Sequence, residues 1–163
     1  MSNDKIINLE TYEVIDDDSK FIIVDSLIAD TIVILNQLGY KTKACCSGHS
    51  FPQKKELFIN QDLDYLEDVE KENIHDIVEI REESFDYWYE WTFTDIYILF
   101  DKIYDFLNLP EGFCVDDDNN CCIRCTVEFY KDGKRKKIDD IYKEIEKYNN
   151  TLYEWARKLP KIN

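Results

Sequence analysis

Glycine, proline and histidine are scarce in this chain. Its 163 residues include four glycines and three prolines, which excludes collagen-like and Gly/Pro-rich low-complexity chains. The only histidines are His49 and His75, so few acid/base schemes that use imidazole are open to the protein. Its longest apolar runs, such as residues 32–35, are far too short to cross a bilayer. We therefore expect a protein with no membrane segment.

Basic residues are also few. Lys and Arg number 20 against 35 Asp and Glu, which gives a net charge of −15. Because Lys and Arg drive the binding of phosphate groups, this balance disfavours direct contact with nucleic acid or with anionic lipid. The first residues lack the basic and apolar regions of a signal peptide. The six cysteines include two adjacent pairs, which make poor disulfides, so we expect a cytoplasmic protein with reduced thiols.

Apolar residues are present in the amount that a folded core needs. The chain is 44% hydrophobic and 14% aromatic. Apolar residues at helical spacing predict a helix over 27–38, which Asp25 and Ser26 cap and Gly39 ends. A longer apolar stripe predicts an amphipathic helix over 138–159, before Pro160. This stripe is typical of a helix that covers a sheet, although it could also pair with a second chain.

The remaining patterns predict strands. We expect them at 21–24, at 41–45, around 57–59, at 95–100, and in a hairpin formed by 113–115 and 121–129. A short helix is expected around 103–107. Residues 1–163 should therefore form one α+β domain, in which the two main helices pack on a mixed or antiparallel sheet.

An acidic, aromatic-rich insertion interrupts this domain at 62–95. It holds thirteen acidic residues against Lys71 and Arg81, and therefore eleven of the fifteen net negative charges. Acids beside aromatic residues suit an interface with a basic protein. The residues that we expect to bind such a partner are Glu67, Asp68, Glu70, Glu72, Glu79, Glu82, Glu83, Asp86, Trp88 and Glu90.

The stretch Cys46-Ser47-Gly48-His49 is the most informative short sequence. It could be only a tight turn, with Gly48 at positive φ. Alternatively, its backbone N–H groups could bind an anion, its side chains could ligate a metal, or His49 could activate Cys46 as a nucleophile. Arg124, on a predicted strand, could meet an anionic group. These five residues form the predicted ligand-binding set.

Zinc needs about four ligands, and Cys122-x-x-Cys125 has an inviting spacing. In a strand, however, residues three apart point to opposite faces, so we expect Cys121 and Cys125 to fill the core instead. The acidic turns 16–18 and 116–118 lack the pattern of a calcium loop. We therefore assign no metal ligand, no cofactor and no catalytic residue.

Two resemblances can be stated. Residues 35–49, with the pattern LNxxGYxTxxCCSGH, and residues 152–160 resemble uncharacterised small proteins of Firmicutes and their phages. More distantly, Thr42 with Cys46-Ser47-Gly48 is similar to a motif of wybutosine-synthesising tRNA methyltransferases, in which an arginine stands at the position of His49. That resemblance implies binding of S-adenosylmethionine and modification of a tRNA base.

Three functions follow as hypotheses. The first is a non-catalytic inhibitor, phage-encoded or related to defence, that presents a nucleic-acid-like acidic surface to a basic protein. The second is a small-ligand-binding protein or a methyltransferase-like enzyme with its site at residues 46–49. The third is a structural oligomer formed through the C-terminal helix.

Overall fold

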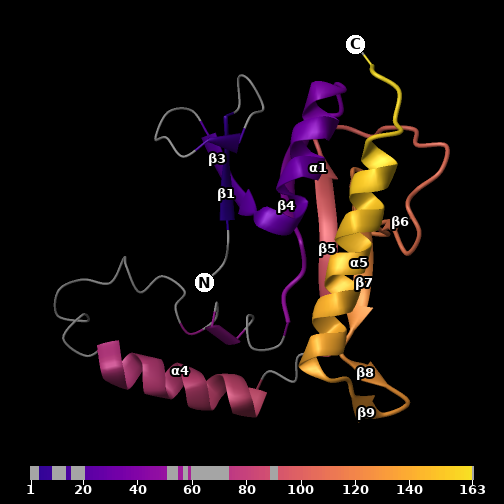
Figure 1. Ribbon diagram of the computed structural model, residues 1–163. Helices are drawn as coiled ribbons and strands as arrows, with labels where there is room; N and C mark the ends of the chain where they lie inside the picture. Colours follow the sequence, from indigo (N-terminus) through magenta and orange to yellow (C-terminus); the bar gives the residue numbers. More distant parts are fainter. Residues whose placement is uncertain are drawn as a thin grey trace.

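The computed structural model describes residues 4–8, 14–15, 21–50, 55–56, 59, 74–88 and 92–162 (Figure 1). Side chains are described from residue 24 onward within these ranges, except for 82–88. Among the described helices, none has the length and apolar character needed to span a bilayer.

The centre of the fold is a four-stranded antiparallel sheet in the order β4-β5-β7-β6. Its strands are β4 (Thr42–Cys46), β5 (Phe93–Phe100), β7 (Cys122–Glu128) and β6 (Cys114–Val115). The predicted hairpin is confirmed, because β6 pairs directly with β7 across the turn that begins at Asp116. The short β4 and β6 form the two edges.

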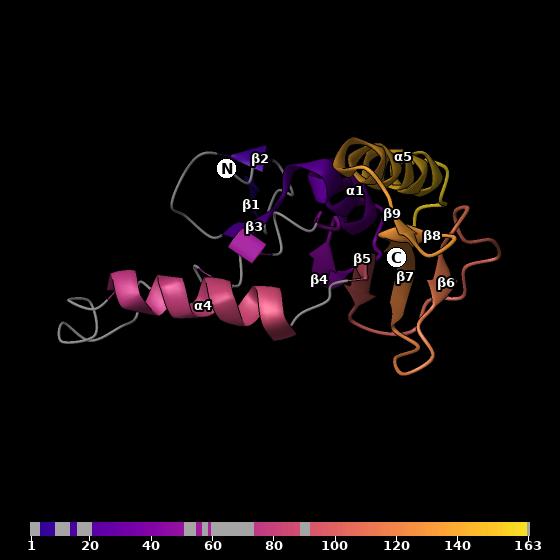
Figure 2. The ribbon, with the colours of Figure 1, turned by 90° about the horizontal axis from the view of Figure 1, so that it is seen from below.

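Two helices cover one face of this sheet, which we call the helix-covered face. They are α1 (Ser26–Gln37) and α5 (Ile138–Ala156), and they lie side by side over the strands (Figure 2). Ile28, Ile32 and Leu35 of α1 meet Ile145 and Leu152 of α5 in the core. The α+β prediction is confirmed, and Ile141, Ile145 and Leu152 of the apolar stripe are buried within their own chain.

Strand periodicity assigns the other side chains to what we call the far face. On β7, Ile123, Cys125 and Val127 are buried in the core, whereas Arg124 and Thr126 alternate with them. The predicted division of this strand between two faces is therefore confirmed. Cys121 is a correction, because it precedes β7 in the turn and is half-buried outside the core.

The N-terminal part adds a second sheet, of order β2-β1-β3. It consists of β1 (Asp4–Asn8), β2 (Val14–Ile15) and β3 (Phe21–Asp25), and β3 runs directly into α1. The third sheet is a two-stranded hairpin of β8 (Tyr130–Lys131) and β9 (Lys134–Arg135). Its turn residues, Asp132 and Gly133, both have positive φ, as tight hairpins require.

Two predicted elements differ in the structure. Residues 103–107 are irregular instead of helical, and Leu107 is 99% exposed, so the apolar residues there are not a buried stripe. Phe106 is instead a single anchor, packed edge-on against Trp155. In the stretch expected as a strand around 57–59, Ile59 is helical and buried, and the other residues lie outside the described ranges.

The C-terminal segment closes the end of α1. The Ile162 N–H donates to the carbonyl of Leu38 at 2.8 Å, and the Tyr40 hydroxyl donates to the carbonyl of Pro160 at 2.9 Å. Between them, Gly39 has φ +98°, and a Cβ there would lie 2.5 Å from the Ile162 carbonyl oxygen. Only glycine therefore fits this junction.

Candidate functional site

The two adjacent cysteines at the end of β4 face opposite ways. Cys45 pairs with Ile98 and packs against the core, whereas Cys46 pairs with Tyr97 on the far face. Burial, followed by the nearby Asp25 and Cys46, raises the pKa of the Cys45 thiol to about 12. Cys45 is therefore a protonated core thiol at neutral pH, whereas Cys46 lies outside the core.

The turn after Cys46 is held on two sides. Gly48 has φ +84°, and a Cβ there would lie 3.1 Å from the Ile96 side chain. Asn149 of α5 donates to the Ser47 carbonyl at 2.9 Å, and the His49 N–H donates to the Thr94 hydroxyl at 2.9 Å. The positive φ expected of Gly48 is present, and these bonds fix where Cys46 and His49 lie.

Asp25 completes the site from a different part of the chain. It occupies the residue before α1, but its side chain makes no capping hydrogen bond. Its Oδ2 instead accepts two bonds from Ser47, one from the N–H at 3.2 Å and one from the hydroxyl at 2.9 Å. Asp25, which the sequence predicts as a helix cap, thus supplies the carboxylate of the site instead.

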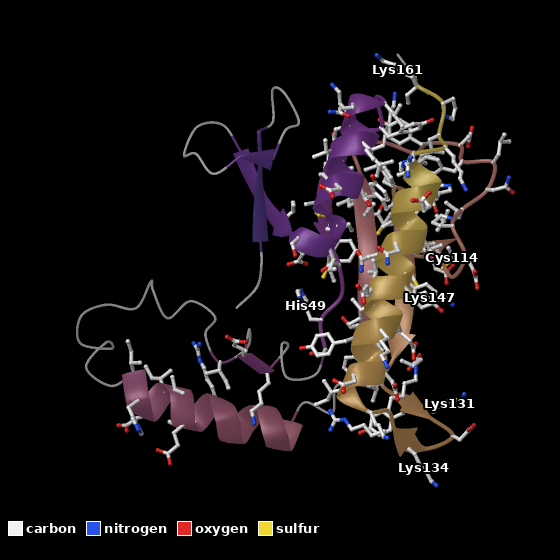
Figure 3. All side chains as sticks on the ribbon, viewed as in Figure 1. His49, Cys114, Lys131, Lys134, Lys147 and Lys161 are labelled. Carbon is white, nitrogen blue, oxygen red and sulfur yellow. The ribbon has the colours of Figure 1, made fainter. Side chains whose placement is uncertain are left out.

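Asp25, Cys46 and His49 converge on one point. One ligand atom from each, a carboxylate oxygen, the Cys46 sulfur and a ring nitrogen, lies within 4.8 Å of both others. The His49 Nε2 is 3.7 Å from the Asp25 Oδ2, and these side chains are 21% and 24% exposed. Figure 3 shows His49 on the segment after β4, near the start of α1. The cluster is therefore half-buried and within reach of solvent.

The backbone N–H groups of the turn are already used. The Ser47 N–H donates to Asp25, the Gly48 N–H to the Cys46 sulfur at 3.4 Å, and the His49 N–H to Thr94. An anion bound by this turn would have to displace these bonds. The structure therefore favours chemistry by the side chains.

Three converging donors suit a metal better than they suit a nucleophilic relay. In a relay, the nucleophile and the carboxylate contact opposite nitrogens of the imidazole, which holds them apart. Around tetrahedral zinc, bonds of about 2.0–2.3 Å place neighbouring ligand atoms about 3.3–3.8 Å apart. The separation of Asp25 and His49 already lies in that range. The N–H bond to the Cys46 sulfur also stabilises the thiolate that a metal needs.

Arg124, the fifth residue of the predicted set, lies elsewhere on the far face. Strand register puts it beside Tyr97 and therefore one strand beyond Cys46. Its guanidinium is 3.4 Å from Asp95 and pairs with Asp116, whose side chain is 5% exposed. The structure thus brings residues 46–49 together with Asp25 and holds Arg124 in a separate ion pair.

A hollow of about 300 Å³ lies on the far face next to Tyr97. Its other walls include Leu99 of β5, Arg124 of β7 and Asp116 of the connection between β6 and β7. Burial, and then the nearby Cys46, raises the pKa of the Tyr97 hydroxyl above its ordinary value. Tyr97 is therefore a neutral hydrogen-bond donor at physiological pH, between the cluster and the hollow.

The remaining cysteines do not join the cluster. Cys114 lies on the opposite edge strand (Figure 3), and Cys122 faces the hollow. Cys125 lies in the core, where burial raises its thiol pKa to about 11. Its separation from Cys122 across the sheet agrees with the expectation from strand periodicity.

Five of the predicted partner-binding residues belong to α4 (Ile74–Trp88). Glu79 is exposed there. Glu82, Glu83, Asp86 and Trp88 belong to the helix, but their side chains lie outside the described set. The others, Glu67, Asp68, Glu70, Glu72 and Glu90, lie outside the described residues altogether.

The chain matches no protein-family model, no curated protein and no solved structure. The two resemblances noted in the sequence remain expectations.

Proposed function

We propose that this protein binds a transition-metal ion of the zinc class through Asp25, Cys46 and His49. The observation that carries the proposal is the convergence of the three donor atoms within 4.8 Å. The residues come from two separate elements, β3 and the end of β4, and Ser47 bonds Asp25 in place. Such outer contacts are what orient metal ligands in proteins.

The donor set selects the ion. A thiolate is a soft ligand and favours zinc, or a neighbouring late transition metal, over magnesium or calcium. One thiolate and one carboxylate together balance the charge of a divalent cation. The ion would therefore be held in a half-buried site without leaving an uncompensated charge.

The test is metal content together with cobalt spectroscopy. The purified chain should carry about one zinc per chain, and cobalt in its place should give the thiolate-to-metal absorption band. Cys46→Ser should abolish the band, and His49→Ala should reduce the metal content.

The chain offers a matched control for the cysteine variant. Cys114→Ser removes an exposed cysteine elsewhere and should keep the metal. Circular dichroism checks that each variant is folded. A wild-type chain without bound metal, or equal binding by Cys46→Ser, would refute the proposal.

The metal hypothesis is a specific form of the small-ligand or enzyme function expected at residues 46–49. If the resemblance to wybutosine-synthesising enzymes is meaningful, S-adenosylmethionine should raise the melting temperature. Gly48→Val should remove that rise. An unchanged melting temperature in the folded wild-type protein would count against this version.

A second candidate is the acidic surface for a basic protein partner. The favouring observation is on α4, where Ile80 is 62% exposed and has the exposed Asp76 and Glu79 near it. An exposed apolar residue among acids suits a protein interface better than a purely solvated face. We expect association that weakens with salt, and that is lost when five acids of residues 67–90 are changed to lysine. Binding that survives this reversal would refute it.

A further inference from the structure

The number of protein ligands distinguishes two kinds of metal site. Structural zinc sites use four protein ligands, whereas sites that do chemistry use about three and leave one position for an exchangeable ligand. Within the described residues, the cluster holds three donors.

The surroundings of the cluster indicate where a fourth ligand would enter. Toward the helices, the turn is closed, because Gly48 lies against Ile96, Thr94 and Ile145. Asp25 and His49 retain about a fifth of their side-chain surface exposed. Cys46 lies on the far face, so the accessible side of the cluster is turned away from the core.

Tyr97 lies between the accessible side of the cluster and the hollow. It is the direct cross-strand neighbour of Cys46, and such pairs place their side chains on the same face about 5 Å apart at Cβ. It also lines the 300 Å³ hollow. Within the described ranges the structure gives its hydroxyl no hydrogen bond, so the hydroxyl is a donor at the boundary of both spaces.

We propose that the fourth position of the metal is exchangeable, opens toward the hollow, and takes a small molecule through a carbonyl or carboxyl oxygen that Tyr97 hydrogen-bonds. This inference rests on the proposed metal site. The volume of the hollow is at the small end of ligand pockets. Its walls carry Asp95 and Asp116 against the single Arg124, so they repel multiply charged anions such as phosphates.

The experiment uses the cobalt-substituted full chain and acetohydroxamate, a small carbonyl-containing metal ligand. Adding it should shift the visible cobalt bands along a saturable curve. Tyr97→Phe should keep the thiolate-to-cobalt band and weaken acetohydroxamate binding by about two- to tenfold, the effect of one neutral hydrogen bond. Tyr130→Phe is the matched control, because it removes an exposed hydroxyl from the β8–β9 hairpin and should change nothing.

The outcomes separate the two proposals. Failure of the wild-type chain to bind cobalt refutes the metal site and this inference with it. A bound cobalt whose visible bands do not respond to acetohydroxamate refutes the exchangeable position and leaves the metal site standing. Equal affinity in wild type and Tyr97→Phe refutes the role of the tyrosine.

Discussion

Neighbouring residues of β5 experience very different surroundings. Ile96 and Ile98 on the helix-covered face are completely buried, whereas Asp95, Tyr97 and Leu99, which alternate with them, are only half-buried on the far face. The helix-covered face is apolar and packed by α1 and α5. The far face carries the Arg124 ion pairs, the hollow and the cluster at Cys46. The helix-covered face therefore contributes most of the stability, and the far face carries the candidate site. Substitutions on one face should have limited effect on the other.

The largest expected effect comes from the helix-covered face. Ile98→Ala should lower the free energy of unfolding by about 2–5 kcal/mol, because it leaves a cavity in the core. Urea denaturation measures the loss. Leu99→Ala, one residue along on the far face, should cost clearly less. Equal losses would mean that the far face is packed as tightly as the core.

Arg124 tests whether the far face also contributes to stability. Arg124→Leu removes the partner of Asp116, which is almost fully buried, and should cost about 1–3 kcal/mol. The half-exposed guanidinium keeps the effect below that of a fully buried pair. Adding Asp116→Asn should restore part of the loss in urea denaturation. A double variant no more stable than the single one would show that Arg124 acts through packing alone.

Gly48 lies where the two faces meet. Its replacement tests how much backbone strain and a close side-chain contact each destabilise the protein. Gly48→Ala forces an L-residue to φ +84° at a cost of about 1–2 kcal/mol, and its Cβ also meets Ile96. Gly133→Ala is the control, because it has φ +73° with nothing within 4 Å. Thermal unfolding should rank Gly48→Ala as the less stable variant. Only Gly48→Ala should also weaken metal binding, and equal behaviour of the two would contradict the role of the turn.

The smallest expected effect is a loss of stability at alkaline pH, caused by the buried thiols of Cys45 and Cys125. Cys45 and Cys125 have folded-state pKa values of about 12 and about 11, against an ordinary value of 9.0. Above pH 9 the unfolded chain releases these protons while the folded protein keeps them, so stability should fall as pH rises. Urea denaturation at a series of pH values measures the slope. Cys125→Ala should reduce the slope, whereas Cys114→Ser should leave it unchanged.

Periodic patterns made most of the fold predictable. The spacing of apolar residues located α1 and α5 to within a few residues, and alternation assigned Ile123 and Arg124 to opposite faces. Strands as short as β2 have too few residues to show a period. The helix expected around 103–107 failed because its apolar residues are individual anchors or exposed side chains.

The site was predictable only in part. The positive φ of Gly48 could be expected, because a Ser-Gly pair between a strand and a loop is a local signature. Asp25 could not be assigned, because an Asp before a helix is typical of a cap, and its actual partner, Ser47, is 22 residues away. Arg124 was placed on the correct face, but the partner Asp116 depends on how the turn before β7 folds. Contacts between residues that are far apart in the sequence produce no periodic pattern from which they could be predicted.

The closure of α1 by residues 160–162 affects how the protein is made. Because synthesis proceeds from the N-terminus, α1 leaves the ribosome before the α5 side chains that pack on it and before the segment bonded to Leu38. The bond between Tyr40 and Pro160 spans 120 residues. Until α5 has emerged from the ribosome, the apolar side of α1 lacks the cover that α5 gives it and is a natural substrate for chaperones. The core on this side of the sheet should therefore close only once α5 has been synthesised.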